Sequence, residues 1–375
     1  MDGARRPACP LASPSVTDAL AARLAARTLE LIDVPSESRS EAPLAAHVLQ
    51  LLTAAGVPVR DGGDTCVLAG VTRRGERPLV LLAGHFDTVP AQGNIPGRIQ
   101  DGVVHGLGAV DMKGSLAVMI ELAIDRANGG GAQDGVDLGF VFFGREELPS
   151  AESALEPLLA REDGLRTADL AIVMEPTDTA LQAGCLGNVN GTWTFTGRSG
   201  HSARPWLADN AIEHAARGIA ALAGVAPVDH DFGGLTYAEV ISVTTIAGGI
   251  ADNVIPDEVR AHVNYRYPPG MTPDAAAARA HELCDPFGTL EITSNAPSGP
   301  VPLDNQLVER LRAAGDLRRE PKQAWTPVAE FGAAGVDAVN FGPGAPPFAH
   351  TRDEHVAAAD LARGYAVIDA FARGA

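Results

Sequence analysis

Apolar residues follow two different spacings along the first half of the chain. Between Ser15 and Ala55 they recur every three and four positions, which predicts two amphipathic helices separated by the turn PSESRS. Further on, apolar runs of strand length alternate with helical segments. The runs lie in 65–71, 78–85, 136–144 and 169–176, and the helices begin near Met112 and in 151–162. Strands that are apolar throughout and alternate with helices indicate an α/β fold, with a mostly parallel sheet covered on both faces.

The middle of the chain has a different pattern, in which apolar and polar residues alternate. The alternation occurs in 192–198, 238–249, 258–267 and 290–295, with helical spacing in 210–225 and 273–287. This β-α-β-β-α-β order predicts a small α+β domain of the ferredoxin-like kind, with one antiparallel sheet. From about Pro297 the first pattern resumes. We therefore expect a catalytic domain formed by residues 1–187 and 295–375, interrupted by an inserted domain, residues 188–294.

Length and composition narrow the classes of protein. At 375 residues the chain is long for one core, which favours two domains or one domain with an insertion. Its 29 basic and 47 acidic side chains give a formal net charge of -18, which argues against nucleic acid or an anionic membrane as a partner.

Two further features bear on location. No apolar run approaches the roughly 20 residues of a membrane span, and segment 1–15 has no apolar core of a secretory signal. The four cysteines have neither metal-binding nor disulfide spacing, so a reducing cytoplasm is the expected location.

Two histidines and five carboxylates stand beside the ends of predicted strands or in loops that follow them. They are His85, Asp87, Asp111, Glu146, Glu147, Glu175 and His350. In an open α/β sheet, ligands bind beyond the carboxyl ends of the strands, so these side chains are expected to meet. Imidazole with carboxylate and no thiolate suits zinc, cobalt or manganese, whereas calcium and magnesium favour oxygen ligands alone. Seven groups are enough for two metals that share a carboxylate, with two groups left for other roles.

Each of these signals also has a plain structural explanation when it is taken alone. The histidine and aspartate after the second strand could be a structural histidine beside a capping carboxylate, and the adjacent glutamates could mark a solvated loop. Asp111 could be a helix N-cap, and His350, in a Gly/Pro-rich loop, could be structural. Because five separate segments each supply such residues, a metal centre is the favoured interpretation.

Seven motifs carry a resemblance to a known family. They are GHFDTVP, GLGAVDMKG, FGREELPS, VMEPTD, GRSGHSARP, DNVIPDEVRAHVNYRY and NFGPGAPPFAHTRDEHV. Together they resemble the successive signatures of the co-catalytic zinc aminoacylase and carboxypeptidase family of metallopeptidases, and within it the succinyl-diaminopimelate desuccinylases of actinobacteria. The resemblance extends from about Leu29 to about Leu361 and is more specific for the family than for the substrate.

The resemblance implies a role for each residue of the expected centre. It makes Asp111 a carboxylate that bridges two Zn²⁺ ions per subunit, which Co²⁺ or Mn²⁺ can replace. His85 and Glu175 would complete one metal site, and Glu147 and His350 the other. The activity that follows is hydrolysis of an amide by a metal-activated water.

Three other expectations also come from the resemblance. Glu146 matches the general base, and Asp87 matches the residue that orients the imidazole ring of His85. The peptide bond between Asp111 and Met112 is expected to be cis. His201 matches a histidine that reaches the active site from the partner subunit, so a homodimer joined through the inserted domain is expected. Alone, His201 could be a capping or surface residue.

The substrate is the least determined part of the resemblance. Asn253, Arg266 and Arg204 match positions that would bind a substrate carboxylate, although Arg266 alone could be a surface charge on a strand. In the run WTPVAEF, Pro327 and Glu330 stand where desuccinylases have Asp and Arg. Glu330 would repel an anionic group there and prefer a neutral or cationic one.

The best match is therefore a desuccinylase of N-succinyl-LL-2,6-diaminopimelate, in the biosynthesis of lysine and diaminopimelate. Alternatives are a deacylase of another N-acyl amino acid, such as an acetylornithine-like compound or an intermediate of a specialised pathway, and a small-peptide carboxypeptidase or dipeptidase. A binding protein stabilised by zinc is the alternative outside the enzymes.

Overall fold

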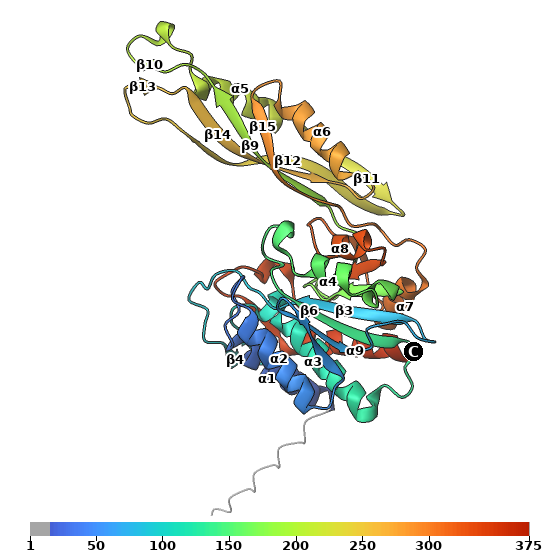
Figure 1. Cartoon of the computed structure of the whole chain (residues 1–375). Coiled ribbons are helices and arrows are strands. Elements are labelled where there is room, and N and C mark those ends of the chain that lie inside the picture. Colours follow the sequence, from blue (N-terminus) through green and yellow to red (C-terminus); the bar gives the residue numbers. More distant parts are fainter. Residues whose placement is uncertain (1–15, 375) are drawn as a thin grey trace, which may run out of the picture.

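The computed structural model describes residues 16–374 and consists of two lobes (Figure 1). The larger lobe contains an eight-stranded sheet, and the smaller one contains a five-stranded sheet and extends away from it. Segment 1–15, in which no secretory signal was expected, lies outside the described residues. Every helix within residues 16–374 is too short or too polar to span a lipid bilayer.

The large sheet is parallel at its centre. Its strand order is β1-β2-β6-β3-β7-β17-β8-β16, and the four neighbours β6, β3, β7 and β17 run parallel. The antiparallel pairs β1-β2, β2-β6 and β8-β17 make the sheet mixed towards its edges. The strands are Val59–Gly63 (β1), Cys66–Gly70 (β2), Leu79–His85 (β3), Asp137–Phe143 (β6), Leu170–Val173 (β7), Leu181–Ala183 (β8), Arg319–Pro321 (β16) and Ala338–Asn340 (β17).

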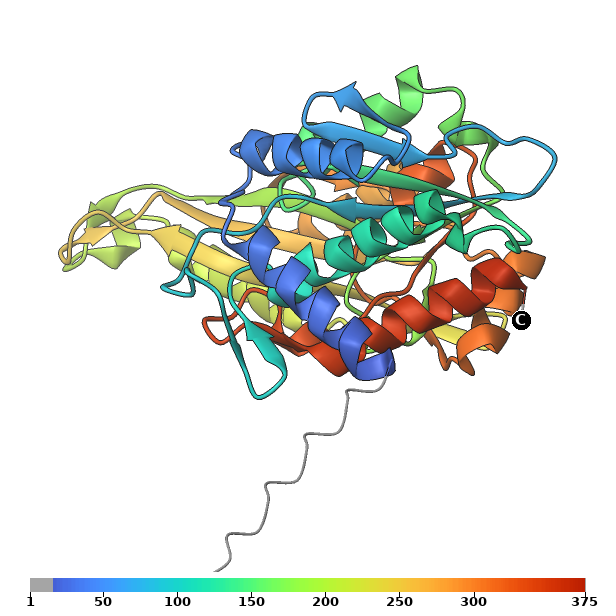
Figure 2. The same cartoon turned by 90° about the horizontal axis from the view of Figure 1, so that it is seen from below.

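Helices cover both faces of this sheet. On one face, three long helices lie side by side (Figure 2): Val16–Ile32 (α1), Gly114–Asp125 (α3) and Ala358–Arg373 (α9). Ala42–Ala54 (α2) and Gln306–Gly315 (α7) add apolar side chains to the same core. The other face packs against Leu155–Arg161 (α4) and Val328–Ala333 (α8). Because both faces are covered, all seven residues of β3 are buried, which explains its unbroken apolar run.

The smaller lobe is an α+β unit with a separate core. Its strands Gly187–Thr196 (β9), Leu235–Gly248 (β12), Glu258–Tyr267 (β14) and Thr289–Ala296 (β15), with helices Ala211–Ala223 (α5) and Pro273–Cys284 (α6), give the predicted β-α-β-β-α-β order. All strand pairs are antiparallel in the order β11-β12-β14-β9-β15. Val228–Phe232 (β11) is an extra strand that the sequence pattern missed. Alternate residues of β9 pack against the helices, and those between them lie on the open face of the sheet.

Two adjacent segments of the chain join the two lobes. The chain leaves the large lobe at Cys185 and returns at Gly299, and the two residues pair with each other through N–H···O bonds of 3.3 and 3.0 Å. The hydroxyl of Tyr237, at the start of β12, donates to the carbonyl of Ala183 next to this crossing. The strands of the smaller lobe run from Gly187 to Ala296, and the division into domains at 1–187, 188–294 and 295–375 stays a prediction.

Several short or irregular elements were not predicted from the sequence. A small sheet joins Arg98–Gln100 (β4), Val103–His105 (β5) and His355–Ala357 (β18), and a two-residue pair joins Gly200–His201 (β10) to Val254–Ile255 (β13). Helices α8 and α9 were missed as well. The helix expected from Met112 begins two residues later, because Asp111 and Met112 have non-helical backbone angles.

Candidate metal centre

His85 is placed by a strand that is buried along its whole length. It is the last residue of β3, and its side chain is 1% exposed. Gly84 allows α3 and its preceding turn to pack against this strand end, since a Cβ at that position would lie 2.7 Å from Leu116 and 2.8 Å from Met112. The strand therefore holds the imidazole in a rigid, water-poor position.

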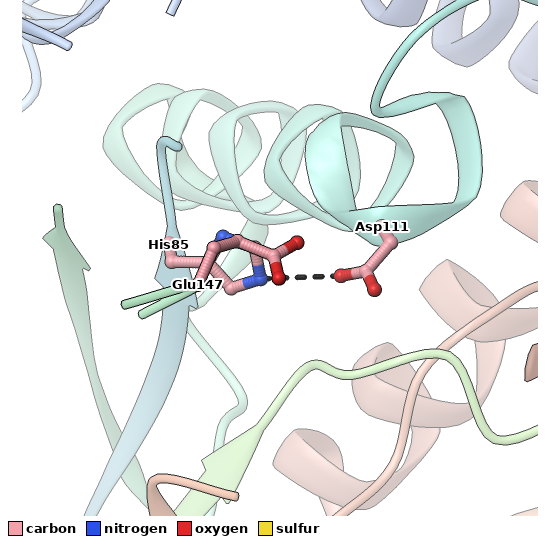
Figure 3. A group of neighbouring side chains, drawn as sticks. All are labelled: His85, Asp111 and Glu147. Atoms are coloured by element: carbon pink, nitrogen blue, oxygen red, sulfur yellow. Dashed lines mark hydrogen bonds and ion pairs between the residues drawn. The ribbon is translucent and has the colours of Figure 1, made fainter. Parts of the chain in front are cut away.

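Asp111 faces two histidines, one with each carboxylate oxygen. Its Oδ1 lies 3.1 Å from Nε2 of His85, and its Oδ2 lies 3.4 Å from Nε2 of His350. Figure 3 shows Asp111 at the start of the α3 segment, pointing at His85 across the end of β3. The predicted cis peptide bond between Asp111 and Met112 is confirmed.

One glutamate accompanies each histidine. Glu175, just after β7, places Oε1 3.7 Å from Nε2 of His85, and Glu147, in the loop after β6, places Oε1 2.9 Å from Nε2 of His350. The result is two groups of one histidine and one glutamate, with Asp111 between them. His350 has a left-handed backbone, φ 61°, which is uncommon for a residue other than glycine. Five segments that are distant in sequence thus meet at one edge of the sheet.

Glu146 also reaches this cluster. Metal-binding atoms lie within 4.8 Å of one another in two sets, His85 with Asp111 and Glu147, and His85 with Glu146 and Glu175. Among the described contacts, His350 pairs with Glu147 and not with Glu146. Both glutamates thus lie near His85, but only Glu147 pairs with His350, and the different roles expected for the two stay predictions.

The pKa values of the cluster show that several of its carboxylates are buried close to one another, an arrangement that a cation would stabilise. Burial, followed by repulsion from Asp111, raises the pKa of Glu175 to about 7. Burial, followed by the carboxylate of Glu175, raises the pKa of Glu146 well above its usual value. Hydrogen bonds to Asp111 and Glu147 raise the pKa of His350 to about 10. Glu146, Glu175 and the imidazole of His350 therefore hold protons more tightly than such groups do in water.

A metal fits these donors. The buried Oε1 of Glu175 has no hydrogen-bond partner among the described residues, although an isolated buried oxygen of this kind is costly. Ligands at about 2.0–2.2 Å from a tetrahedral zinc ion lie roughly 3.3–3.6 Å from one another. The separations of 3.1, 3.4 and 3.7 Å between imidazole nitrogens and carboxylate oxygens are close to this spacing. The cluster is therefore a site that can bind metal.

Asp87 makes more contacts than the sequence suggested. Its Oδ1 lies 3.5 Å from Nδ1 of His85, and the shorter contact of that ring nitrogen, 3.0 Å, is to the main-chain carbonyl of Asp87. The two carboxylate oxygens also accept the backbone N–H groups of Glu146 and Glu147, both at 3.0 Å. Asp87 therefore ties the loop that carries both glutamates to the end of β3.

Two supporting residues were missed altogether. The hydroxyl of Ser38, in the turn between α1 and α2, donates to Oδ2 of Asp87 at 2.9 Å. Glu354 is buried, with 2% of the residue exposed, and its carboxylate accepts the backbone N–H groups of Gly108, Val110 and Asp111. The only signal in the sequence was the position of Glu354 four residues after a candidate ligand, which does not distinguish it from a surface residue.

Three candidate substrate or catalytic residues lie on the smaller lobe, far from the cluster. His201 pairs with Val254 across β10 and β13, Asn253 accepts the N–H of Ser202 through its carbonyl, and Arg204 follows in the same turn. This group lies at the end of the smaller lobe that points away from the larger lobe (Figure 1). Within one chain, the structure brings these residues to one another and not to the histidines of the large lobe.

Arg266 lies at the opposite end of the smaller lobe, on its five-stranded sheet. It precedes the last residue of β14, opposite Asn188 of β9, next to the crossing between the lobes. Its Nε donates to Oδ1 of Asn264 at 2.9 Å, and no ion pair with a carboxylate is formed among the described residues. Burial lowers the pKa of the Arg266 guanidinium, as expected for a cation without an acidic partner.

Glu330 is buried on α8 beside the start of α4. It is 7% exposed, and neither carboxylate oxygen has a hydrogen-bond partner among the described residues. Burial, and then the nearby Glu156, raise the pKa of Glu330 to about 7. None of its described contacts reaches the metal-binding cluster, and its role in selecting the substrate stays a prediction.

Comparison with known proteins identifies the family. The sequence model of the family described as Peptidase family M20/M25/M40 matches residues 81–374. The chain therefore belongs to this family and is a hydrolase of amide bonds, as the motifs predicted. A Mycobacterium tuberculosis protein provisionally named succinyl-diaminopimelate desuccinylase DapE is 39% identical over 347 residues, which cover 90% of this chain and 96% of the relative. The succinyl-diaminopimelate desuccinylase of Corynebacterium glutamicum is 35% identical over 335 residues, 87% of this chain and 90% of the relative.

Solved structures show the same fold at low sequence identity. A tripeptidase from Staphylococcus aureus superposes with a TM-score of 0.77 at 19% identity and covers 94% of this chain and 98% of its own. An M20 family metallo-carboxypeptidase from Sulfolobus solfataricus gives 0.75 at 16% identity, with 93% and 98% covered. At these identities the likeness concerns the fold.

The two adjacent glutamates can be separated by substitution. Because Glu147 pairs with His350 while Glu146 does not, we expect Glu147→Ala to lose metal, and Glu146→Gln to keep the metal content and lose turnover by roughly 10²–10⁴-fold. Metal content by mass spectrometry and amide hydrolysis would be measured on the same preparations. Equal metal content with high activity in both variants would overturn this assignment.

Proposed function

We propose that this protein is a di-zinc amidohydrolase that removes the acyl group of an N-acyl amino acid. The observation that carries the proposal is the carboxylate of Asp111, which faces His85 with one oxygen and His350 with the other. One ion would be held by His85, Glu175 and Asp111, and the second by His350, Glu147 and Asp111. Zn²⁺ suits these ligands, and Co²⁺ or Mn²⁺ can substitute for it.

The proposed mechanism gives a role to each of the two remaining carboxylates, Glu146 and Asp87. The bound metals would supply electrostatic activation of a water molecule and of the amide carbonyl. Glu146 takes a proton from the attacking water and delivers it to the leaving nitrogen, so that amide and water give a carboxylate and an amine. Asp87 holds the backbone of the glutamate loop through both its oxygens, which fixes the base relative to His85.

Arg266 is proposed as the anchor of a substrate carboxylate. The chain has a formal charge of -18, yet this half-buried guanidinium has no acidic partner among the described residues, so it can bind the carboxylate of a substrate. Its Nε is held by Asn264, and Asn264 donates to Asn188 and Asn190 at 2.7 and 2.8 Å. The terminal nitrogens of Arg266 are thereby left for the ligand.

The proposed substrate is N-succinyl-LL-2,6-diaminopimelate, supported by the names of the 35–39% identical relatives. This would make the protein an enzyme of lysine and diaminopimelate biosynthesis in the cytoplasm. Another N-acyl amino acid, an acetylornithine-like compound or a small peptide is the second candidate, favoured by the replacement at Glu330. A binding protein that keeps metal for stability would bind the ions and hydrolyse none of these compounds.

A homodimer through the smaller lobe is proposed from its free sheet edge. Within residues 16–374, no strand pairs with the outer edge of β12 beyond Glu239. Beside this edge, a groove between α5 and β12 includes the apolar side chains of Ile219, Leu222, Ile241 and Val243 in its lining. An unpaired edge with apolar side chains next to it favours pairing with another chain. A second copy could then bring its His201, which is exposed, to the metals of the first.

The substrate proposal is tested with a panel of N-succinyl, N-acetyl and aminoacyl diamino acids, measuring release of free amine by the zinc-loaded protein. We expect the succinyl compound to be preferred, and Arg266→Ala to raise its KM by about 10–100-fold, the value of a charge-assisted hydrogen bond pair. Arg260→Ala, on the same strand but paired with Glu258, is the matched control and should leave KM unchanged. If the protein hydrolyses no compound of this panel, the proposed deacylase activity is refuted.

The exchange of His201 between subunits is tested by mixing two inactive variants. Glu146→Gln and His201→Ala would be unfolded together and refolded at equal amounts. If His201 serves the partner's site, each mixed dimer has one complete site, and recovered activity should approach about a quarter of the unaltered protein. Glu146→Gln mixed with Glu147→Ala is the control, because no complete site can form. Failure of the first mixture to exceed this control would show that His201 does not act across subunits.

A further inference from the structure

Glu354 is a buried carboxylate that the proposed mechanism does not use. It is 2% exposed and lies four residues after His350, at the end of the loop that leads into β18. Buried glutamates are rare unless their oxygens are bonded. No arginine or lysine side chain forms an ion pair with Glu354 among the described residues, and the nearby Lys113 donates instead to the carbonyl of Val34 at 2.9 Å.

All the described hydrogen bonds of this carboxylate go to one loop. Oε2 accepts the backbone N–H of Gly108 at 2.9 Å, and Oε1 accepts those of Val110 and Asp111, both at 3.1 Å. The main-chain carbonyl of Glu354 accepts a fourth N–H, from Gly106, at 3.0 Å. The segment that carries His350 is therefore fastened to the loop that carries Asp111 by four hydrogen bonds.

The loop needs such a restraint because its own backbone is permissive. Gly106 and Gly108 have φ values of 151° and 76°, and the chain then passes through a turn that is not helical at Asp111. The direction of the Asp111 carboxylate is fixed by the position of its own backbone, which the N–H bond to Glu354 holds directly. At the other end of the same segment, His350 meets the Oδ2 of Asp111.

We propose that Glu354 is a positioning residue that sets the Asp111 carboxylate between the two histidines, and so couples the His350 loop to the shared ligand. The proposal rests on the proposed function of Asp111 as the bridge between two metals. Glu354 itself touches neither metal nor substrate in this account. Outer residues that orient a ligand typically change metal affinity by about 10–100-fold when they are altered.

Glutamine is the informative replacement. It keeps the length of the side chain, but it has one acceptor oxygen and an NH₂ group, which would point at an N–H donor of the loop. Glu354→Gln therefore loses the hydrogen bonds that one of the two carboxylate oxygens accepts, and it removes the negative charge. It keeps the size of the side chain, so no cavity is left in the core. Glu354→Asp keeps the charge but is one methylene shorter, so it is expected to reach fewer of the three N–H groups.

The matched control is Glu121→Gln. Glu121 is equally buried, 3% exposed, and lies on α3, the helix that follows the same loop. Its oxygens pair with Arg23 and Arg27 of α1, at 3.0 and 2.9 Å, and not with the loop. It reports the effect of losing a buried carboxylate in this region of the fold.

The experiment titrates the metal-free full-length variants with Zn²⁺ in the presence of a competing chelator. We expect Glu354→Gln to lower zinc affinity by about 10–100-fold and Glu354→Asp to have a smaller effect, while Glu121→Gln matches the unaltered protein. Hydrogen exchange of peptides covering 106–112, measured without metal, should accelerate in Glu354→Gln and not in the control. This second readout depends on the hydrogen bonds alone.

The outcomes separate this inference from the function on which it rests. If the unaltered protein binds zinc and Glu354→Gln binds it with unchanged affinity, Glu354 does not position Asp111 and only the inference fails. If the unaltered protein binds no zinc, the proposed function fails first. Should Glu354→Gln not fold, Glu354→Asp decides: faster exchange in 106–112 with weaker zinc binding supports the inference, and unchanged values overturn it.

Discussion

The arrangement of the candidate metal centre depends on one carboxylate that faces two histidines. Asp111 presents one oxygen to each of two histidines that are distant in sequence. Five carboxylates lie around two imidazoles in a buried position, and burial, followed by repulsion from neighbouring carboxylates, raises the pKa values of Glu146 and Glu175. Divalent cations are the natural counter-charge, so the stability of this end of the sheet and its chemistry have the same physical origin.

A second feature follows from the first, because polar groups on loops need rigid support to meet at one place. In the cluster, only His85 lies on a strand, Glu175 lies two residues after one, and the other groups lie on turns. In two places a buried carboxylate supports a turn by accepting its backbone N–H groups: Asp87 holds the glutamate loop, and Glu354 holds the loop before Asp111. Such bonds are stronger than those between neutral groups, and they hold the backbone of each turn while its other side chains stay available to the cluster.

The sequence predicted what depends on local pattern and missed what depends on tertiary contact. The apolar run of β3 and the alternation of β14 were recognised within one residue, since burial on two faces or on one leaves a direct trace. The three-stranded sheet of β4, β5 and β18 was missed because its strands have three residues each and owe their pairing to distant parts of the chain. The family motifs supplied the residues of the cluster, but not the bonds of Asp87 and Glu354 to backbone groups, which have no sequence signature. Nor could the pattern show that His201 lies at the far end of the smaller lobe.

The most direct test of the central claim counts metal ions per chain in two variants equilibrated with Zn²⁺. If Asp111 is shared, Asp111→Ala should disturb both sites and retain less than one ion per chain. Glu175→Ala should retain one ion, held by His350, Glu147 and Asp111. Two ions retained by Asp111→Ala, or none by Glu175→Ala, would contradict the shared carboxylate on which this account depends.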